Sequence, residues 1–100
     1  FSEKRLPSVP EVPTMAEAGG PPLLASTWVM FLAPAGTPRE IVNKLSQAVS
    51  DAVKSPEVSG KLNDLGIIPV GNTSDQAARF LADEIAQWGR VISTAGVKTD

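Results

Sequence analysis

Cysteine, histidine and tyrosine are all absent from this sequence of 100 residues. The lack of cysteine and histidine excludes zinc sites built on those ligands, haem held by histidine, thiol chemistry and a Ser-His-Asp triad. Because tyrosine is missing too, aspartate, glutamate and lysine are the main remaining candidates for general acid–base chemistry. The composition therefore favours a chain that is not an enzyme, and we expect no metal and no cofactor.

The sequence also has no excess of positive charge. Lys and Arg number 9 against 11 Asp and Glu, which gives a net charge of −2. Proteins that bind nucleic acid gain most of their affinity from basic groups that neutralise phosphates, so we expect no nucleic-acid partner. No apolar run approaches the roughly 18 residues that a membrane-spanning helix needs. The hydrophobic share of 42% and the charged share of 20% are typical of a globular protein.

Residues 1–25 are rich in proline, which fixes its own φ and disfavours the helical region for the residue before it. One short helix is nevertheless predicted inside this stretch. Thr14 and Glu17 have the spacing of a capping box, and Gly19 or Gly20 supplies a left-handed stop. We therefore expect about one and a half turns of helix between extended segments.

Two segments have the character of β-strands. Residues 26–33 contain an unbroken apolar run from Trp28 to Ala33, which is typical of a strand covered on both faces in a parallel sheet. A shorter strand is predicted over residues 67–70, and Pro69 places it at the edge of a sheet because proline has no backbone donor.

A pair of helices is predicted between these strands. Thr37 is the expected N-cap, with Pro38 at the first helical position and Glu40 three residues after the cap. The helix restarts at Ser55-Pro56 and ends at Gly66. One apolar stripe along the first helix consists of Ile41, Leu45, Ala48, Val49 and Ala52.

The last helix, about 20 residues long, is the most clearly marked element. Thr73 begins it with a capping box that ends at Gln76, and Gly96 closes it. Its apolar stripe consists of Ala77 or Ala78, Leu81, Ile85, Trp88, Ile92 and Ala95. Trp88 is expected in the core because it lies on this stripe. The neighbouring carboxylates Asp83 and Glu84 diverge by about 100° around the helix, so we expect them on a solvated face.

The predicted fold class is α/β, with three helices and two strands. Two strands cannot cover the apolar sides of three helices, and an isolated two-stranded sheet is marginally stable at best. We therefore expect the sheet to be completed by polypeptide upstream of these residues or by a second copy of the chain.

The strongest candidate for ligand binding is the start of the first strand. Ser26 and Thr27 place hydroxyl groups beside the indole of Trp28, and such a combination of polar groups with an aromatic ring is common in binding clefts. A structural role for Trp28 is an equally good interpretation of the same residues.

Several sequence blocks, in this order and spacing, resemble the C-terminal third of the Bug/TctC proteins, the periplasmic solute receptors of tripartite tricarboxylate transporters. The resemblance covers nearly the whole chain. The blocks are Pro10-Glu11-Val12-Pro13-Thr14-Met15-Ala16-Glu17-Ala18-Gly19, Phe31-Leu32-Ala33-Pro34-Ala35-Gly36-Thr37-Pro38, Ser55-Pro56-Glu57-Val58, Leu65-Gly66, Trp88-Gly89 and Ala95-Gly96, together with Arg5 and Trp28.

The resemblance implies a partial lobe of a two-lobed periplasmic-binding-protein fold of type II, the Venus-flytrap arrangement, in a protein about three times as long. It implies that residues 1–24 finish the second lobe, that 25–33 form a strand crossing the hinge, and that 34–100 complete the first lobe. Such receptors close around their ligand by a hinge motion.

The resemblance further implies that the intact protein captures a small organic acid in the periplasm and presents it to a membrane permease. A leader for export is then expected outside this chain. The residues expected near the ligand are Ser26, Thr27, Trp28 and Thr14.

Two other functions fit the same pattern of elements. The chain is then a stand-alone interaction module whose apolar faces form a homodimer, or a part of an α/β enzyme whose catalytic groups lie upstream. A tight dimer in analytical ultracentrifugation favours the first alternative, and upstream His or Cys residues at strand ends favour the second.

Overall fold

The computed structural model describes residues 1–98 and contains three helices. They are α1 over Arg39–Lys54, α2 over Pro56–Asp64 and α3 over Ser74–Ala95. The three predicted helices are therefore confirmed. The last two residues of the range 34–100 expected for the first lobe lie outside the described residues.

The N-cap of α3 is the predicted one, whereas the N-cap of α1 is not. Thr73 and Gln76 form the predicted capping box, because the Thr73 hydroxyl accepts from the Gln76 amide and the Gln76 side chain accepts from the Thr73 amide. At α1 the predicted N-cap is wrong by one residue, since Pro38 occupies that position and no side chain caps the helix. The Thr37 hydroxyl instead donates to the Pro34 carbonyl oxygen at 2.8 Å, which closes the preceding turn.

Glycine ends α2 and α3 as the sequence predicts. Gly66 has a φ of 71°, and the following amide of Ile67 donates to the carbonyl oxygen of Leu62 at 2.8 Å. Gly96 has a φ of 66°, and the Val97 amide donates to the Ile92 carbonyl oxygen at 3.2 Å. Both ends show the long hydrogen bond of the Schellman motif, which needs a residue in the left-handed conformation.

The two predicted strands, 26–33 and 67–70, are not formed in the described part of the chain. Both segments lack helical structure and run between other elements, but no described residue pairs with either of them in a β-ladder. A strand exists only through hydrogen bonds to a neighbouring strand, so an apolar, β-prone segment stays unassigned when no partner strand is present. The predicted α/β fold is therefore only partly formed in residues 1–98, which contain the three helices but no sheet.

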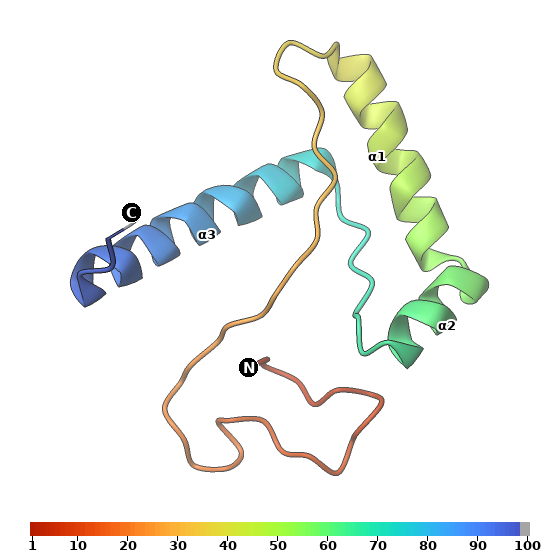
Figure 1. Cartoon of the computed structure of the whole chain (residues 1–100). Coiled ribbons are helices and arrows are strands. Elements are labelled where there is room, and N and C mark those ends of the chain that lie inside the picture. Colours follow the sequence, from red (N-terminus) through yellow and green to blue (C-terminus); the bar gives the residue numbers. More distant parts are fainter. Residues whose placement is uncertain (99–100) are drawn as a thin grey trace.

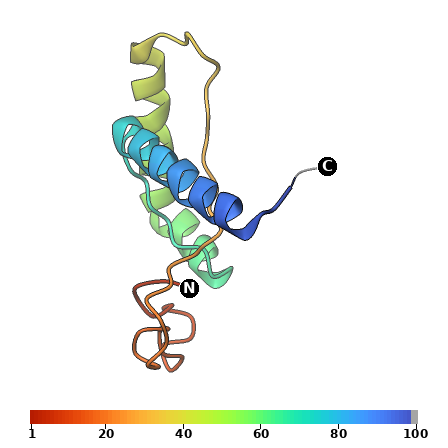
Figure 2. The ribbon, with the colours of Figure 1, turned by 90° about the vertical axis from the view of Figure 1, so that its left-hand side faces the viewer.

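The N-terminal segment, residues 1–25, forms an irregular loop that lies below the helices in both views (Figures 1 and 2). The predicted short helix is reduced to one turn, in which the Ala18 amide donates to the Thr14 carbonyl oxygen. Its capping box is formed, because the Thr14 amide donates to Glu17 Oε2 at 2.8 Å and the Glu17 amide donates to Thr14 Oγ1 at 3.2 Å.

The face of α1 that packs against the chain shares only Val49 with the predicted apolar stripe. Ile41 and Leu45, which lie on that stripe, are 49% and 55% exposed. The more buried face lies roughly 100° around the helix and contacts the segment before α3. It consists of Val42, Ser46, Val49, Ser50 and Val53.

Apolar side chains are not enclosed anywhere in residues 1–98. No hydrophobic residue there is buried, and the accessible surface is 8258 Å². A compact monomer of this mass exposes about 5,400 Å². The radius of gyration of 16.6 Å also exceeds the roughly 13 Å of a compact 100-residue domain. The helices are thus arranged in the open (Figure 1), with α3 meeting α1 near its own N-terminus and then extending away from it.

Candidate functional site

Trp28 is the one predicted site residue that contacts a helix through its side chain in the described chain. Its indole Nε1 donates to Glu84 Oε2 at 2.9 Å. Its ring meets that of Phe80 edge to face, with centroids 5.4 Å apart and planes at 82°. Trp28 remains 39% exposed, so its ring is both anchored and accessible.

The same carboxylate oxygen accepts from a second tryptophan. Trp88 Nε1 donates to Glu84 Oε2 at 3.0 Å, one helical turn further along α3. Trp88 is 40% exposed, so its expected place in a buried core is wrong for the described structure. Glu84, expected on a solvated face, is half-buried between the two indoles. We refer to Trp28, Phe80, Glu84 and Trp88 as the indole cluster.

Sequence reasoning missed Glu84 as a member of this site. A usable signal was present in α3, because Phe80, Glu84 and Trp88 follow one another at intervals of four residues and so lie on one face. What the sequence could not indicate is that Trp28, 56 residues before Glu84, reaches the same carboxylate.

The other predicted site residues are not brought together. Ser26 and Thr27 are exposed on the segment before Trp28, and their hydroxyl groups make no hydrogen bond within residues 1–98. Thr14 lies in the N-terminal turn, where its hydroxyl oxygen accepts from the Glu17 amide. Thr14 therefore has a local structural role, while Ser26 and Thr27 present free hydroxyl groups.

Glu17 is the centre of the ordered part of the N-terminal loop. Arg5 Nε donates to Glu17 Oε2 at 2.8 Å, and Arg5 also donates to the Pro10 carbonyl oxygen at 2.9 Å. The hydrogen bond from Arg5, followed by that from the Thr14 amide, lowers the pKa of the Glu17 carboxyl below its ordinary value. Arg5 and Glu17 thus form an ion pair on the surface of the loop.

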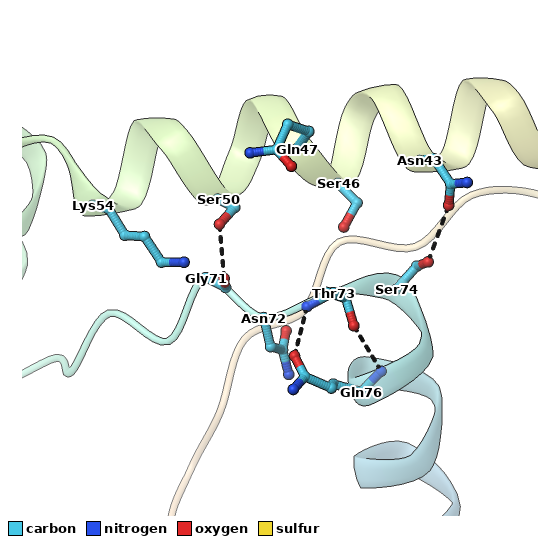
Figure 3. Close-up of a pocket in the computed structure, with 10 residues that line it drawn as sticks. All are labelled: Asn43, Ser46, Gln47, Ser50, Lys54, Gly71, Asn72, Thr73, Ser74 and Gln76. Carbon is cyan, nitrogen blue, oxygen red and sulfur yellow. Dashed lines mark hydrogen bonds between the residues drawn. The ribbon is translucent and has the colours of Figure 1, made fainter.

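A polar groove of about 370 Å³ lies between α1 and the beginning of α3 (Figure 3). Ser50, the one buried side chain in residues 1–98, closes its floor by donating to the Gly71 carbonyl oxygen at 2.7 Å. The groove is lined by Asn43, Ser46, Gln47, Ser50, Lys54, Gly71, Asn72, Thr73, Ser74 and Gln76.

The lining of this groove defines what it can accept. Lys54 is the one charged side chain among the lining residues, and the others supply hydroxyl, amide and backbone groups. Such a surface can make hydrogen bonds to a small polar or anionic solute, but it offers no nucleophile with an adjacent base. Residues 1–98 contain no group of three or more acidic, His or Cys side chains that could hold a metal ion. None of the helices they form is long and apolar enough to cross a membrane.

Comparison with known proteins identifies the family. The profile of the Tripartite tricarboxylate transporter family receptor, TctC, matches residues 1–97. TctC proteins are periplasmic solute-binding receptors and not enzymes, which confirms the expectation that the chain is not part of an enzyme. No solved structure gives a significant match to the chain.

Individual relatives agree with this family. The chain is 39% identical to Protein BugT of Bordetella pertussis over 98 residues, which are 98% of this chain and 30% of that protein. It is 38% identical to a UPF0065 protein in the tcbD-tcbE intergenic region of a Pseudomonas species, covering 88% of this chain and 26% of that protein. A third relative, a UPF0065 protein in the clcB-clcD intergenic region of Pseudomonas knackmussii, is 36% identical over 86% of this chain and 52% of its own length.

The chain thus spans between about a quarter and a half of the length of these bacterial relatives. The match to the family profile runs from the first residue to residue 97, so it includes the N-terminal loop, the indole cluster and the polar groove. From this match we conclude that the chain belongs to the TctC family of tripartite tricarboxylate transporter receptors.

Proposed function

We propose that these residues form the C-terminal part of a periplasmic receptor that captures a small organic acid and presents it to the permease of a tripartite transporter. The family membership supports the receptor, and the tricarboxylate transporter in the family's description supports an organic acid as the solute. Specificity in such a receptor comes from donors preorganised in a closing cleft rather than from covalent chemistry.

The observation that carries this proposal is the complete lack of buried apolar side chains in residues 1–98. Val29, Phe31 and Leu32 are 90%, 79% and 76% exposed, although they belong to the most apolar segment of the sequence. A segment apolar on both faces fits the middle of a parallel sheet, where helices cover both sides. The exposed faces of α1 and α3 are of the kind that covers such a sheet.

The proposed architecture assigns each segment to a part of the receptor. Residues 1–24 end the second lobe, residues 25–33 form the strand that crosses the hinge, and residues 34–100 complete the first lobe. The irregular loop formed by residues 1–25, lying apart from the helices in Figure 1, is consistent with this division. The remaining strands of the sheet come from polypeptide upstream of the chain.

The proposed ligand-proximal residues are Ser26, Thr27 and Trp28, with Thr14 from the second lobe. Ser26 and Thr27 have hydroxyl groups free of other hydrogen bonds in the described chain, and Trp28 offers an accessible indole face. Thr14 uses its hydroxyl oxygen as an acceptor from Glu17, which leaves the hydroxyl hydrogen available for a ligand carboxylate.

A thermal-shift screen of the native gene product against succinate, citrate and other di- and tricarboxylates tests this function. An acid present at 100 times its dissociation constant should stabilise the protein by about 2.7 kcal/mol. Thr27→Val should weaken binding of that acid by about tenfold, the loss of roughly one hydrogen bond. Thr94→Val, at an exposed position of α3, is the matched control and should leave binding unchanged. Stabilisation by none of these acids would contradict the proposal.

A second candidate is favoured by the same exposed faces, because a second copy of the chain can cover them as well as upstream polypeptide can. In that case the chain is a dimerising module with an intermolecular sheet. Analytical ultracentrifugation of the native gene product separates the two candidates. A monomer with a mass about three times that of this chain supports the receptor, and a tight dimer of chains of about 10.5 kDa supports the module.

A further inference from the structure

Residues 26–33 make one hydrogen bond to the rest of the described chain, and it is the bond from Trp28 to Glu84. No backbone amide or carbonyl of this segment is paired within residues 1–98. Trp28 is also far less exposed, at 39%, than Val29 beside it, at 90%. The hydrogen bond at Trp28 thus attaches the segment to α3, and beyond it Met30 is partly buried while Val29, Phe31 and Leu32 are exposed.

The chemistry of Glu84 suits it to hold this point. An indole can only donate, and a carboxylate oxygen has two lone pairs that can accept. Glu84 Oε2 receives Trp28 at 2.9 Å and Trp88 at 3.0 Å, so its two lone pairs have two donors. Hydrogen bonds to an ionised acceptor are roughly twice as strong as those between neutral groups.

The position of the Glu84 carboxylate is itself fixed by neighbouring side chains. Trp88 lies four residues after Glu84 on the same helix, so its bond fixes the Glu84 side chain without help from another element. Phe80, four residues before Glu84, also contacts the Trp28 ring edge to face. Trp28 therefore contacts Phe80 and Glu84 on one face of α3, and Trp88 on the same face shares its acceptor.

We propose that Glu84 is a positioning residue, which fixes Trp28 on α3 and thereby sets where the segment 26–33 crosses between the two lobes. That residues 26–33 cross between two lobes rests on the proposed function, because only a two-lobed receptor has such a crossing. That Glu84 attaches Trp28 to α3 does not depend on the proposed function. Ligand affinity then depends on Glu84 although the carboxylate touches no ligand, because Ser26 and Thr27 are placed by the residue that follows them.

The test uses fluorine NMR of the native gene product labelled with 5-fluorotryptophan. The variants Trp28→Phe and Trp88→Phe assign the two resonances. Glu84→Gln keeps the shape of the side chain but removes its charge, and it should shift both resonances. Asp83→Asn removes the same charge from the neighbouring residue, which makes no hydrogen bond to either indole in the described structure, and should shift neither.

A second measurement keeps the proposal falsifiable if chemical shifts alone are ambiguous. In the native gene product, where upstream strands are proposed to pair with residues 26–33, hydrogen exchange by mass spectrometry should show protection of this segment reduced about tenfold in Glu84→Gln and less than twofold in Asp83→Asn. Equal effects of the two variants, a shift of the Trp88 resonance alone, or unchanged protection in Glu84→Gln would each overturn it. Neither of these two measurements uses a ligand. Failure of the proposed function is therefore distinguished from failure of this proposal, because it is detected as an absence of organic-acid binding by the unmodified protein.

Discussion

The hydroxyl of Ser50 donates a 2.7 Å hydrogen bond to the carbonyl oxygen of Gly71 and thereby fastens α1 to the segment that leads into α3 (Figure 3). The two residues lie 21 positions apart in the sequence, and Ser50 is the one buried residue among those described. This bond joins the two sides of the polar groove.

Replacing Ser50 with alanine should lower the free energy of unfolding of the native gene product by about 1 kcal/mol. The reason is that the partly buried Gly71 carbonyl loses its donor. Ser46 lines the same groove without a hydrogen bond in the described chain, so Ser46→Ala is the matched control and should change stability by less than about 0.5 kcal/mol. Urea unfolding measures both. Equal effects at the two positions would show that the Ser50 bond does not fasten α1.

Gly71→Ala should be more destabilising than Gly36→Ala, although both glycines have positive φ, 55° and 82°. A methyl group at Gly71 would lie 2.8 Å from Lys54 Cε and 3.0 Å from Val53 Cγ2, whereas one at Gly36 meets nothing within 4 Å. We expect about 1 kcal/mol for the left-handed backbone at Gly36 and about 2 kcal/mol at Gly71, where crowding is added. Urea unfolding of the two variants gives this difference, and the reverse order would contradict the close approach of α1 to Gly71.

Thr73→Ala should cost about 1 kcal/mol of stability, because it removes the side-chain acceptor of the capping box at α3. Thr37→Ala should cost less, since Thr37 caps no helix and its hydroxyl donates to Pro34 instead. Circular dichroism followed through a urea titration compares the two variants. A larger loss from Thr37→Ala would place the start of α1 at the position predicted from sequence, rather than at the one in the structure.

Acid should release the Arg5–Glu17 pairing at a pH below the ordinary titration range of glutamate. The pKa of Glu17 is lowered in the folded loop, so the pairing stabilises the loop above the unfolded pKa, about 4.3, and is lost as the pH falls through the lower folded pKa. The Thr14 amide resonance reports this change directly because that amide donates to Glu17 Oε2. Its midpoint should lie below 4.3, and Glu17→Gln should abolish the movement. A midpoint at or above 4.3 would mean that the loop is not ordered by this pair.

The 100-residue chain on its own should bind a hydrophobic dye such as ANS and should melt without a sharp transition. The physical reason is that no apolar side chain is buried in residues 1–98, so there is little cooperative packing to lose. The native gene product should bind little dye and melt cooperatively. A sharp thermal transition with low dye binding for the isolated chain would contradict the proposal that other polypeptide covers its helices.

The helix boundaries that could be predicted are those controlled by neighbours in the chain. The capping box of Thr73 and Gln76 spans three residues, and the left-handed stops at Gly66 and Gly96 satisfy carbonyl groups of the preceding turn. Such bonds form within one or two turns, so the sequence contains all of their partners. The family motifs were likewise readable in order along the chain, and the profile match over residues 1–97 agrees with them.

Other features depended on partners distant in sequence or absent from these residues. The segments 26–33 and 67–70 have strand-like composition, but a strand needs a neighbour with which to pair, and the described chain provides none. The face of α1 that packs was decided by the segment before α3, which covers the polar Ser50 and leaves Ile41 and Leu45 of the predicted stripe exposed.

The sequence by itself therefore determined the family, the absence of histidine and cysteine chemistry, and the three helices with most of their ends. Only the tertiary structure decided that Glu84 accepts from Trp28 and Trp88, and that Ser50 holds Gly71. The reason is the separation of the bonding partners along the sequence. Caps and turns arise from hydrogen bonds between near neighbours, whereas contacts across 21 or 56 residues depend on how whole elements meet in space.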